Sequence, residues 1–391
     1  MAARTYLDYA ASAPLRDEAR EAMERYERSD FAGANPNSLH SMGREAARAL
    51  DGARRDLVAC LGGGLRPSDV VWTSGGTEAN NLAVLGMSAG ARARDARRRS
   101  VVLSAIEHDS VLDLAPALRE RGFEVRLAPC DAGGTVTPAL LAGVVDETCA
   151  LVSVMSANNE TGVVQPVEDL ASVAHGCGAL FHTDAVQAFG HVPLALSGVD
   201  AVSVAAHKVG GPVGVGALAL RPRTPLRPLS FGGGQEQGRR AGTQDVRGAL
   251  GFAAAARACH DGLEATRALV ASRAQALYDA LCAPGTGIVP TAGATVGPDR
   301  LPGIVSVMTQ RLDSETLVLS LDQAGFEVSA GSACSSGSLD PSHVLTAMGI
   351  PSRLAYGSLR VSFDERADLA DLGRLAQALL GIVSSHPVRR G

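Results

Sequence analysis

Apolar residues along the first two thirds of the chain follow two alternating patterns. Between residues 38 and 61 they repeat every three or four positions, which predicts an amphipathic helix, and a second helix is expected from Ala79 onward. Runs of consecutive apolar residues predict strands at 69–73, 101–104, 124–127, 150–155, 180–182, 201–204 and 215–220. Short apolar strands separated by helices are typical of a mostly parallel sheet that is covered on both faces.

The last third of the chain has a different pattern. Residues 222–242 are rich in Gly, Pro and Arg and predict an extended loop. An Ala-rich helix with one break is expected over 246–281. Strands are predicted at 304–308 and 326–329, with helices after them. We therefore expect a second, smaller α+β domain.

Composition narrows the class of protein. The chain has 391 residues, of which 46% are hydrophobic and 20% charged, and a net charge of −5. These values fit a globular protein of two domains and predict no nucleic-acid or membrane partner. The N-terminus lacks the apolar core of a signal peptide, so we expect a cytoplasmic protein. Seven cysteines, an odd number without a close pair, predict neither a disulfide scaffold nor a metal site.

Lys208 is the only lysine in the sequence. Arginine can replace lysine as a surface charge, but its pKa is too high for it to act as a neutral amine nucleophile. Lys208 is therefore a candidate for amine chemistry, and the alternative is a surface lysine that has survived by chance.

Residues 73–78, Thr-Ser-Gly-Gly-Thr-Glu, lie between a predicted strand and a predicted helix. Glycines let the backbone approach an anion, and helix N–H groups with the Thr77 hydroxyl can bind a phosphate. A plain tight turn is the alternative. The pattern is neither a Walker A loop nor a dinucleotide fingerprint, which disfavours ATP and NAD.

Two successive strands deliver an acid and the lysine to one edge of the predicted sheet. Asp184 ends one strand, and Lys208 closely follows the next. Ligands of open α/β sheets bind at this edge. Asp184 could cap a helix or bind a metal, but it could also pair with the pyridinium nitrogen of pyridoxal phosphate (PLP), to which Lys208 would form a Schiff base. His108 follows another strand and could serve as a general acid or base, although a lone histidine is more often structural.

Cys334 lies among small polar residues in the stretch Ser-Ala-Gly-Ser-Ala-Cys-Ser-Ser-Gly-Ser at 329–338. The other six cysteines are better explained as small buried hydrophobic residues. An exposed loop suits a thiol that must reach a substrate and then a partner. Cys334 is therefore a candidate nucleophile, although a lone cysteine is more often not one.

Taken together, these features resemble the cysteine desulfurase family, PLP enzymes with the class V aminotransferase fold. The resemblance covers nearly the whole chain. Its motifs lie at 6–11, 35–40, 73–81, 105–108, 157–162, 232–243, 331–336, 341–345 and 358–360. It implies an aspartate aminotransferase-like (fold type I) α/β protein, with a large PLP-binding domain over 15–258 and a small domain formed by 1–14 and 259–391.

The resemblance also implies the role of each site residue. Lys208 carries PLP and then takes the substrate α-proton, and Cys334 receives the sulfur as a persulfide while alanine is released. Asp184 pairs with the ring nitrogen and Gln187 with the phenolic oxygen, and His108 stacks on the ring beside Asn159. Gly76, Thr77 and His207 bind the phosphate, and Thr243 reaches the phosphate of the neighbouring subunit of a homodimer. Asn35 and Arg360 hold the substrate carboxylate. A sulfur-acceptor protein or a small thiol then collects the sulfur.

Several positions depart from the pattern of the family. Ala205 stands where serine is usual, Ser156 where histidine is common, and Asp364 where glycine is typical. The alternatives are a selenocysteine lyase or another β-eliminating PLP enzyme, an ordinary aminotransferase, and an inactive structural partner with this fold. The destination of the sulfur, whether iron–sulfur clusters, tRNA, DNA or a biosynthetic pathway, stays open.

Overall fold

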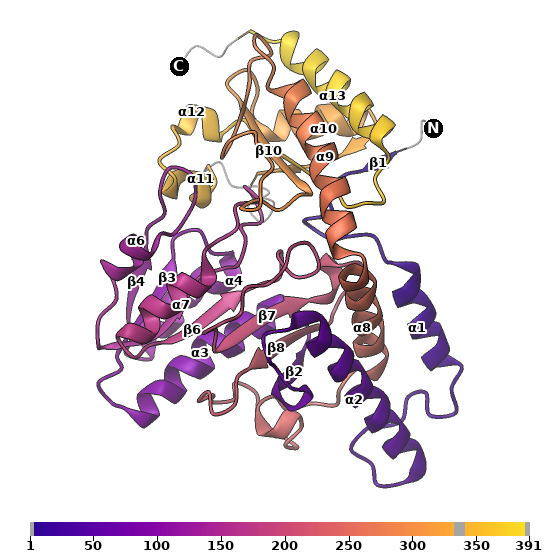
Figure 1. The fold of residues 1–391 in the computed structure, drawn as a ribbon, viewed down its shortest axis with the longest axis vertical. Helices are drawn as coiled ribbons and strands as arrows, with labels where there is room; N and C mark the ends of the chain where they lie inside the picture. The colour runs from indigo at the N-terminus through magenta and orange to yellow at the C-terminus, as the bar shows by residue number, and fades with distance from the viewer. Residues whose placement is uncertain (1–3, 332–340, 388–391) are drawn as a thin grey trace.

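The computed structural model describes residues 4–331 and 341–387. Figure 1 shows two parts, a larger one below and a smaller one above, with both ends of the described chain in the smaller part. Helix α8 (Val246–Asp261) lies in the larger part, and α9 (Leu263–Leu281) continues from it into the smaller part. The predicted break in the Ala-rich helix is confirmed, and it falls at Gly262.

A seven-stranded sheet forms the centre of the larger part. Its strand order is β2-β8-β7-β6-β5-β3-β4, in which β8 runs antiparallel to β2 and β7 and all other neighbouring strands are parallel. The prediction of a mostly parallel α/β sheet is thus confirmed. The strands, in sheet order, are β2 (Val70–Thr73), β8 (Gly216–Leu220), β7 (Ala201–Ala205), β6 (Leu180–Asp184), β5 (Cys149–Ser153), β3 (Ser100–Ser104) and β4 (Glu124–Ala128).

Helices pack around this sheet, as its apolar strands require. Helix α3 packs against β5 to β8, α7 contacts β6, and α1 and α2 both pack on α8. The further helices of this part are α1 (Asp17–Glu27), α2 (Ser41–Leu61), α3 (Gly76–Arg94), α4 (Asp109–Leu112), α5 (Leu114–Glu120), α6 (Pro138–Ala142) and α7 (Val167–Gly176). Three 3-10 turns are η1 (Pro67–Asp69), η2 (Ala206–Lys208) and η3 (Glu236–Gly238).

Two helices begin at other residues than predicted. Helix α2 begins at Ser41 because the His40 imidazole accepts a hydrogen bond from the Gly43 N–H at 3.2 Å and so caps the helix. Helix α3 begins at Gly76, three residues earlier than Ala79. The first free N–H groups of α3 therefore belong to the glycine-rich turn itself.

The smaller part contains a four-stranded antiparallel sheet and a two-stranded parallel one. Their strand orders are β12-β13-β10-β9 and β1-β11. The prediction of one strand over 326–329 is wrong, because these residues form β11 and β12, which pair in different sheets. The elements are β1 (Thr5–Tyr6), β9 (Ile288–Pro290), β10 (Ile304–Thr309), β11 (Phe326–Glu327), β12 (Ser329–Ala330), β13 (Ser358–Ser362), α10 (Ser314–Gln323), α11 (His343–Ala347), α12 (Ser352–Ala355) and α13 (Leu369–Ser384).

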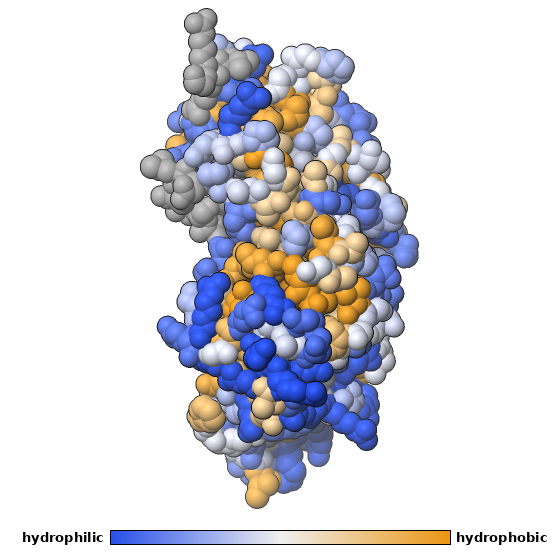
Figure 2. Space-filling view, turned by 90° about the vertical axis from the view of Figure 1, so that its left-hand side faces the viewer, coloured by the Kyte–Doolittle hydropathy of each residue, from blue (hydrophilic) through white to orange (hydrophobic). Residues whose placement is uncertain are grey.

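The apolar core follows the two sheets. One cluster of buried residues combines Leu7 with side chains between Val270 and Val383. The cluster of the larger part also contains Val344 and Met348, although we predict this stretch to belong to the small domain. The domain boundary at residue 258 stays a prediction. In space-filling view, apolar residues gather across the middle of the face in Figure 2, above a hydrophilic lower region.

Among the described residues, none of the helices combines the length and the apolar character that a membrane span requires.

Candidate active site

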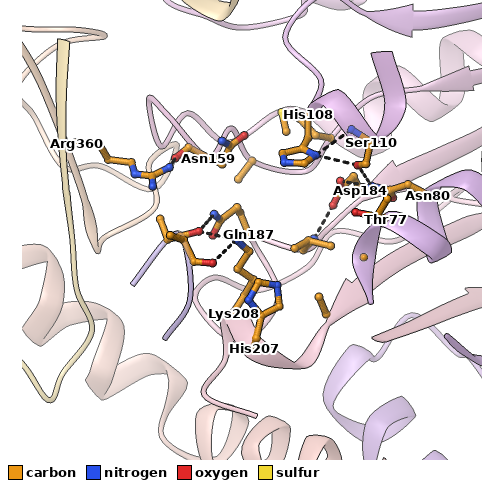
Figure 3. Close-up of a pocket in the computed structure, with 17 residues that line it drawn as sticks. Thr77, Asn80, His108, Ser110, Asn159, Asp184, Gln187, His207, Lys208 and Arg360 are labelled. Atoms are coloured by element: carbon orange, nitrogen blue, oxygen red, sulfur yellow. Dashed lines mark hydrogen bonds between the residues drawn. The ribbon is translucent and has the colours of Figure 1, made fainter. Parts of the chain in front are cut away.

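A cavity of about 300 Å³ lies where the ends of β5, β6 and β7 face β13 (Figure 3). Nine of the predicted site residues line it: Gly76, Thr77, His108, Asn159, Asp184, Gln187, His207, Lys208 and Arg360. The other lining residues are Ala10, Ala11, Asn80, Ser110, Met155, Ala157, Val186 and Ala205. The cavity thus gathers side chains from both parts of the protein.

Lys208 ends η2, the turn that directly follows β7. Its amine donates hydrogen bonds to the Ala10 carbonyl at 2.6 Å and the Ala11 carbonyl at 2.9 Å. The Gln187 amide donates to the same Ala10 carbonyl at 2.8 Å. The N-terminal segment therefore forms one wall of the cavity and holds the lysine within it.

Asp184 is the last residue of β6 and is buried. Its Oδ2 accepts a hydrogen bond from Asn80 Nδ2 at 2.6 Å, and its Oδ1 accepts one from the Val186 N–H at 2.8 Å. Burial raises the pKa of Asp184, and these two donors offset part of the shift because they stabilise the carboxylate. A cationic partner in the cavity would favour the charged form further.

His108 precedes the short helix α4 and caps it. Its Nδ1 accepts a hydrogen bond from the Ser110 N–H at 3.0 Å, so a neutral ring carries its proton on Nε2. The Ser110 hydroxyl lies 2.9 Å from His108 Nδ1 and also accepts a hydrogen bond from Asn80 at 2.9 Å. Asn80 and Ser110 thus connect His108 with Asp184.

Sequence reasoning had assigned no role to Asn80 or Ser110. Asn80 stands three residues after Thr77, at a spacing that places both residues on one face of α3. That spacing was the available signal. The sequence contains no comparable signal for Ser110, because its place in the site depends on the turn between β3 and α4.

The N-terminus of α3 forms another wall of the cavity. Its first residue is Gly76, where a Cβ atom would lie 2.7 Å from Val186 Cγ2, so a larger residue would not fit. Thr77 follows, and His207 lines the same cavity. Burial, with a smaller effect from the nearby Lys208, lowers the pKa of His207 to about 4. His207 is therefore a neutral hydrogen-bonding group at pH 7.

Arg360 lies in the middle of β13 and is 1% exposed. Its guanidinium donates to the Asn159 carbonyl at 2.9 Å and pairs with Asp8 Oδ1 at 2.9 Å. Arg360 Nε has no hydrogen-bond partner among the described residues. A buried guanidinium that faces a cavity can bind a carboxylate with both of its arms.

Asn35 and Thr243 do not line the cavity of their own chain. Both are exposed, and a short polar network joins Asn35 to Gln244, the residue after Thr243. Asn37 Nδ2 donates to Asn35 Oδ1 and to Gln244 Oε1, at 3.0 Å in each case. The two predicted residues therefore belong to one surface outside the pocket. Cys334 lies outside the described residues.

The other cysteines lie away from the cavity, and none of the six lines it. Burial raises the pKa of the Cys60 and Cys149 thiols to about 12, and that of Cys259 and Cys282 to about 11. Thiols with such values are poor nucleophiles at neutral pH. Within the described ranges there is also no group of three or more His, Cys, Asp or Glu residues that could hold a metal ion.

The cavity residues fit PLP. Lys208 offers the amine, and buried Asp184 offers a carboxylate for the ring nitrogen. The glycine start of α3 offers backbone N–H groups for the phosphate. Fold and site together define a PLP-dependent α/β enzyme.

Comparison with known proteins shows to which family of PLP-dependent enzymes the chain belongs. The family model for aminotransferase class V matches residues 5–375, and the chain belongs to this family. A cysteine desulfurase of Cereibacter sphaeroides is 42% identical over 384 residues, which cover 97% of this chain and 96% of the relative. The cysteine desulfurase IscS of Dictyoglomus turgidum is 38% identical, with coverages of 98% and 95%. The solved structure of a NifS-like protein has a TM-score of 0.88 and 33% identity, and covers 98% of this chain and 100% of its own.

Proposed function

We propose that this protein is a cysteine desulfurase, which removes sulfur from L-cysteine, releases L-alanine and leaves a persulfide on Cys334. The observation that carries the proposal is the meeting of the only lysine, a buried carboxylate and a buried arginine in one cavity. Relatives named cysteine desulfurase match along nearly the whole chain. The alternatives on the same fold, a β-eliminating lyase or an aminotransferase, need no acceptor thiol.

PLP, when bound, supplies an electron sink for the electrons released at the substrate α-carbon. Lys208 would hold the cofactor through its amine, and the same amine, when neutral and released, would take the substrate α-proton. Asp184 keeps the ring nitrogen protonated by pairing with it, and Asn80 keeps that carboxylate oriented through its 2.6 Å hydrogen bond. His108 lies over the cavity with its Nδ1 already engaged by Ser110, so its Nε2 is the atom that can exchange a proton.

The remaining cavity residues position the cofactor and the substrate. Gly76, Thr77 and His207 hold the phosphate, and Gln187 holds the phenolic oxygen. Arg360 binds the substrate carboxylate with Asn159 beside it, because the two groups meet at one end of the cavity. The Cys334 thiolate attacks the substrate sulfur, and the C–S bond breaks with its electrons staying on the three-carbon fragment. That fragment takes up one proton at its β-carbon and one at its α-carbon, for which His108 Nε2 and the Lys208 amine are the donors at hand, and leaves as alanine. A protein or small-thiol acceptor then takes the sulfur.

The active form in this proposal is a homodimer, in which Thr243 and Asn35 of one subunit complete the cavity of the other. Their exposed position beside each other, outside the pocket of their own chain, supports this arrangement. Large apolar side chains are also exposed on the described surface, among them Leu39 (89%), Phe231 (85%) and Val213 (79%).

The test mixes purified, PLP-loaded protein with L-cysteine and measures alanine and protein-bound persulfide. Wild-type protein should form both, and Lys208→Ala should lose the Schiff-base absorbance and all turnover. Cys334→Ser should bind cysteine but form no persulfide, whereas Cys282→Ser, the matched control, should behave as wild type. Full activity of Cys334→Ser would show that the acceptor assignment is wrong and would favour a β-eliminating enzyme.

A further inference from the structure

Glu236 is a buried carboxylate within an exposed segment. We define the Thr243 segment as residues 229–244, which lie between β8 and α8. Phe231 and the three glycines after it are exposed, as is Thr243 itself. The side chain of Glu236, by contrast, is only 1% exposed. A buried charge in a surface segment requires partners that offset its lost hydration.

Glu236 has such partners on α2, on β2 and within the Thr243 segment itself. Its Oε1 pairs with Arg54 of α2 at 2.6 Å and accepts a hydrogen bond from Gln244 at 3.0 Å. Its Oε2 accepts a hydrogen bond from the Trp72 N–H of β2 at 3.0 Å. Strand β2 leads directly into the glycine-rich turn at the start of α3, which we propose to bind the phosphate. Glu236 therefore connects the Thr243 segment to that turn.

The backbone at this point is in an unfavourable conformation. Glu236 has a φ of 49° and Gln237 a φ of 59°, both in the left-handed region that residues other than glycine seldom adopt. Such a conformation persists only where surrounding contacts determine it. The contacts of the Glu236 carboxylate hold the backbone of residues 236 and 237 in this conformation.

A second ion pair fixes the segment to α3. Arg240 donates to Glu78 through Nε at 2.8 Å and through its terminal nitrogen at 3.3 Å. Glu78 lies in the first turn of α3, and its Oε2 also accepts a hydrogen bond from the Ser74 N–H at 2.6 Å. The segment is therefore attached on both sides of the phosphate-binding turn.

These contacts fix the two neighbours of Thr243. The N–H of Gly242 donates to the Gln235 side chain at 3.0 Å, and Gln244 is held by Glu236. Thr243 is thus presented outward from a fixed backbone. We propose that Glu236 and Arg240 are positioning residues that hold Thr243 at the phosphate of the cofactor bound by the partner subunit. This inference rests on the homodimer of the proposed function.

A positioning residue of this kind affects the cofactor site of the partner subunit. A substitution that only destabilises the fold would affect the site of its own subunit, so an experiment on mixed dimers can distinguish the two. Two differently tagged chains are co-expressed, and the mixed dimer is purified over both tags. One chain is otherwise wild type, and the other carries Lys208→Ala, so only the first forms the Schiff base that is followed by its absorbance. The readout is the rate at which this absorbance is lost on dilution into buffer without PLP.

Glu236→Gln placed in the Lys208→Ala chain should speed this loss by about ten-fold, as expected when one hydrogen bond to a charged phosphate is removed. The same substitution placed in the Lys208 chain should leave the rate near that of the unmodified mixed dimer. An equal effect in both arrangements, or an effect only in the Lys208 chain, would overturn the proposal.

Arg240→Gln provides a second variant that keeps the test available if Glu236→Gln does not yield a folded dimer. Its matched control is Arg239→Gln, because Arg239 contacts the Ser68 carbonyl and not α3. Arg240→Gln should act in trans, and Arg239→Gln should have no effect. Thermal unfolding and sedimentation measurements should check that each variant is a folded dimer.

Thr243→Ala in the Lys208→Ala chain separates this inference from the proposed function. If Thr243→Ala does not speed the loss of absorbance, the cross-subunit phosphate contact itself is wrong. If Thr243→Ala speeds it but neither Glu236→Gln nor Arg240→Gln does, the dimer stands and the positioning role is wrong.

Discussion

Asn80 donates one hydrogen bond to Asp184 at 2.6 Å and another to Ser110 at 2.9 Å. Both contacts come from a single amide nitrogen, so the orientation of Asp184 and the position of His108, which is bonded to Ser110, depend on the same group. Asn80 Oδ1 has no partner among the described residues.

This relationship predicts a loss of activity in Asn80→Asp. A second carboxylate beside buried Asp184 raises the pKa of the pair, and the ring nitrogen loses a fully charged partner. We expect kcat with L-cysteine to fall by about 10- to 100-fold, corresponding to one or two units of pKa. Asn81→Asp is the control, since Asn81 donates to the Ser110 carbonyl instead. Equal losses in both variants would contradict the assigned role.

Asp184→Asn should have a larger effect. Removing one partner of a buried ion pair costs about 3–5 kcal/mol, which corresponds to a loss of roughly 10²- to 10⁴-fold in kcat. Because Lys208 is unchanged, the variant should still form its Schiff base. Stopped-flow absorbance after mixing with L-cysteine should show slow α-proton removal. Normal kinetics in this variant would rule out Asp184 as the partner of the ring nitrogen.

Arg360→Lys should weaken substrate binding more than turnover. Lysine keeps the positive charge but loses the planar fork that binds a carboxylate through two hydrogen bonds. We expect the KM for L-cysteine to rise about ten-fold or more, since hydrogen bonds to charged groups contribute about 1.5–3 kcal/mol. Steady-state alanine formation measures the effect. Arg366→Lys, which alters an arginine outside the cavity, should leave KM unchanged.

Acid stability should depend on His182. This residue is buried in β6 between the hydroxyls of Ser153 and Ser203, and burial lowers its pKa to about 3. The unfolded state, with a pKa of about 6.5, binds the proton more readily, so His182 destabilises the fold as pH falls from about 6.5 towards 3. The effect reaches about 1.4 kcal/mol per pH unit. Urea unfolding of the apoprotein at several pH values measures it, and His182→Gln should reduce the slope.

Glu107 should act in the opposite direction. Burial raises its pKa to about 8, while Oε1 accepts hydrogen bonds from the Ser104 hydroxyl and the Met155 N–H. The folded state therefore holds this proton above the unfolded pKa of about 4.3, and the stabilisation is lost as pH rises to about 8. Glu107→Gln should remove the loss of stability between about pH 4.3 and pH 8, which urea unfolding of the apoprotein measures. An unchanged pH profile would show that the carboxyl is ionised in the fold.

Local patterns were sufficient to place the centre of the cavity. Asp184 and Lys208 end or follow neighbouring strands of a parallel sheet, and the ends of such strands share one edge whatever the rest of the fold does. Gly76 and Thr77 begin a helix at that edge for the same reason. The positions of Asp184 and Lys208 follow from strand periodicity, whereas Gly76 and Thr77 are marked by the glycine-rich sequence, because helix periodicity predicts a start only at Ala79.

Local sequence patterns could not predict the residues at the periphery of the site. The carbonyls of Ala10 and Ala11 hold Lys208 only because the N-terminal segment packs back across the larger part, and carbonyls carry no residue-specific signal. The separation of Asn35 and Thr243 from their own cavity is likewise a tertiary property. The family resemblance assigns Thr243 to the site of the neighbouring subunit, but it does not say in which subunit Asn35 acts.

The ion pair between Asp8 and Arg360 spans 352 positions of the chain. A ribosome delivers the N-terminal residues first, so the carboxylate of Asp8 emerges long before its partner. The walls that contain Lys208 and the start of α3 can form while synthesis continues, but the end of the cavity that we propose to bind the substrate carboxylate stays open until β13 has been made. A nascent chain could thus capture its coenzyme early and still be unable to process a substrate.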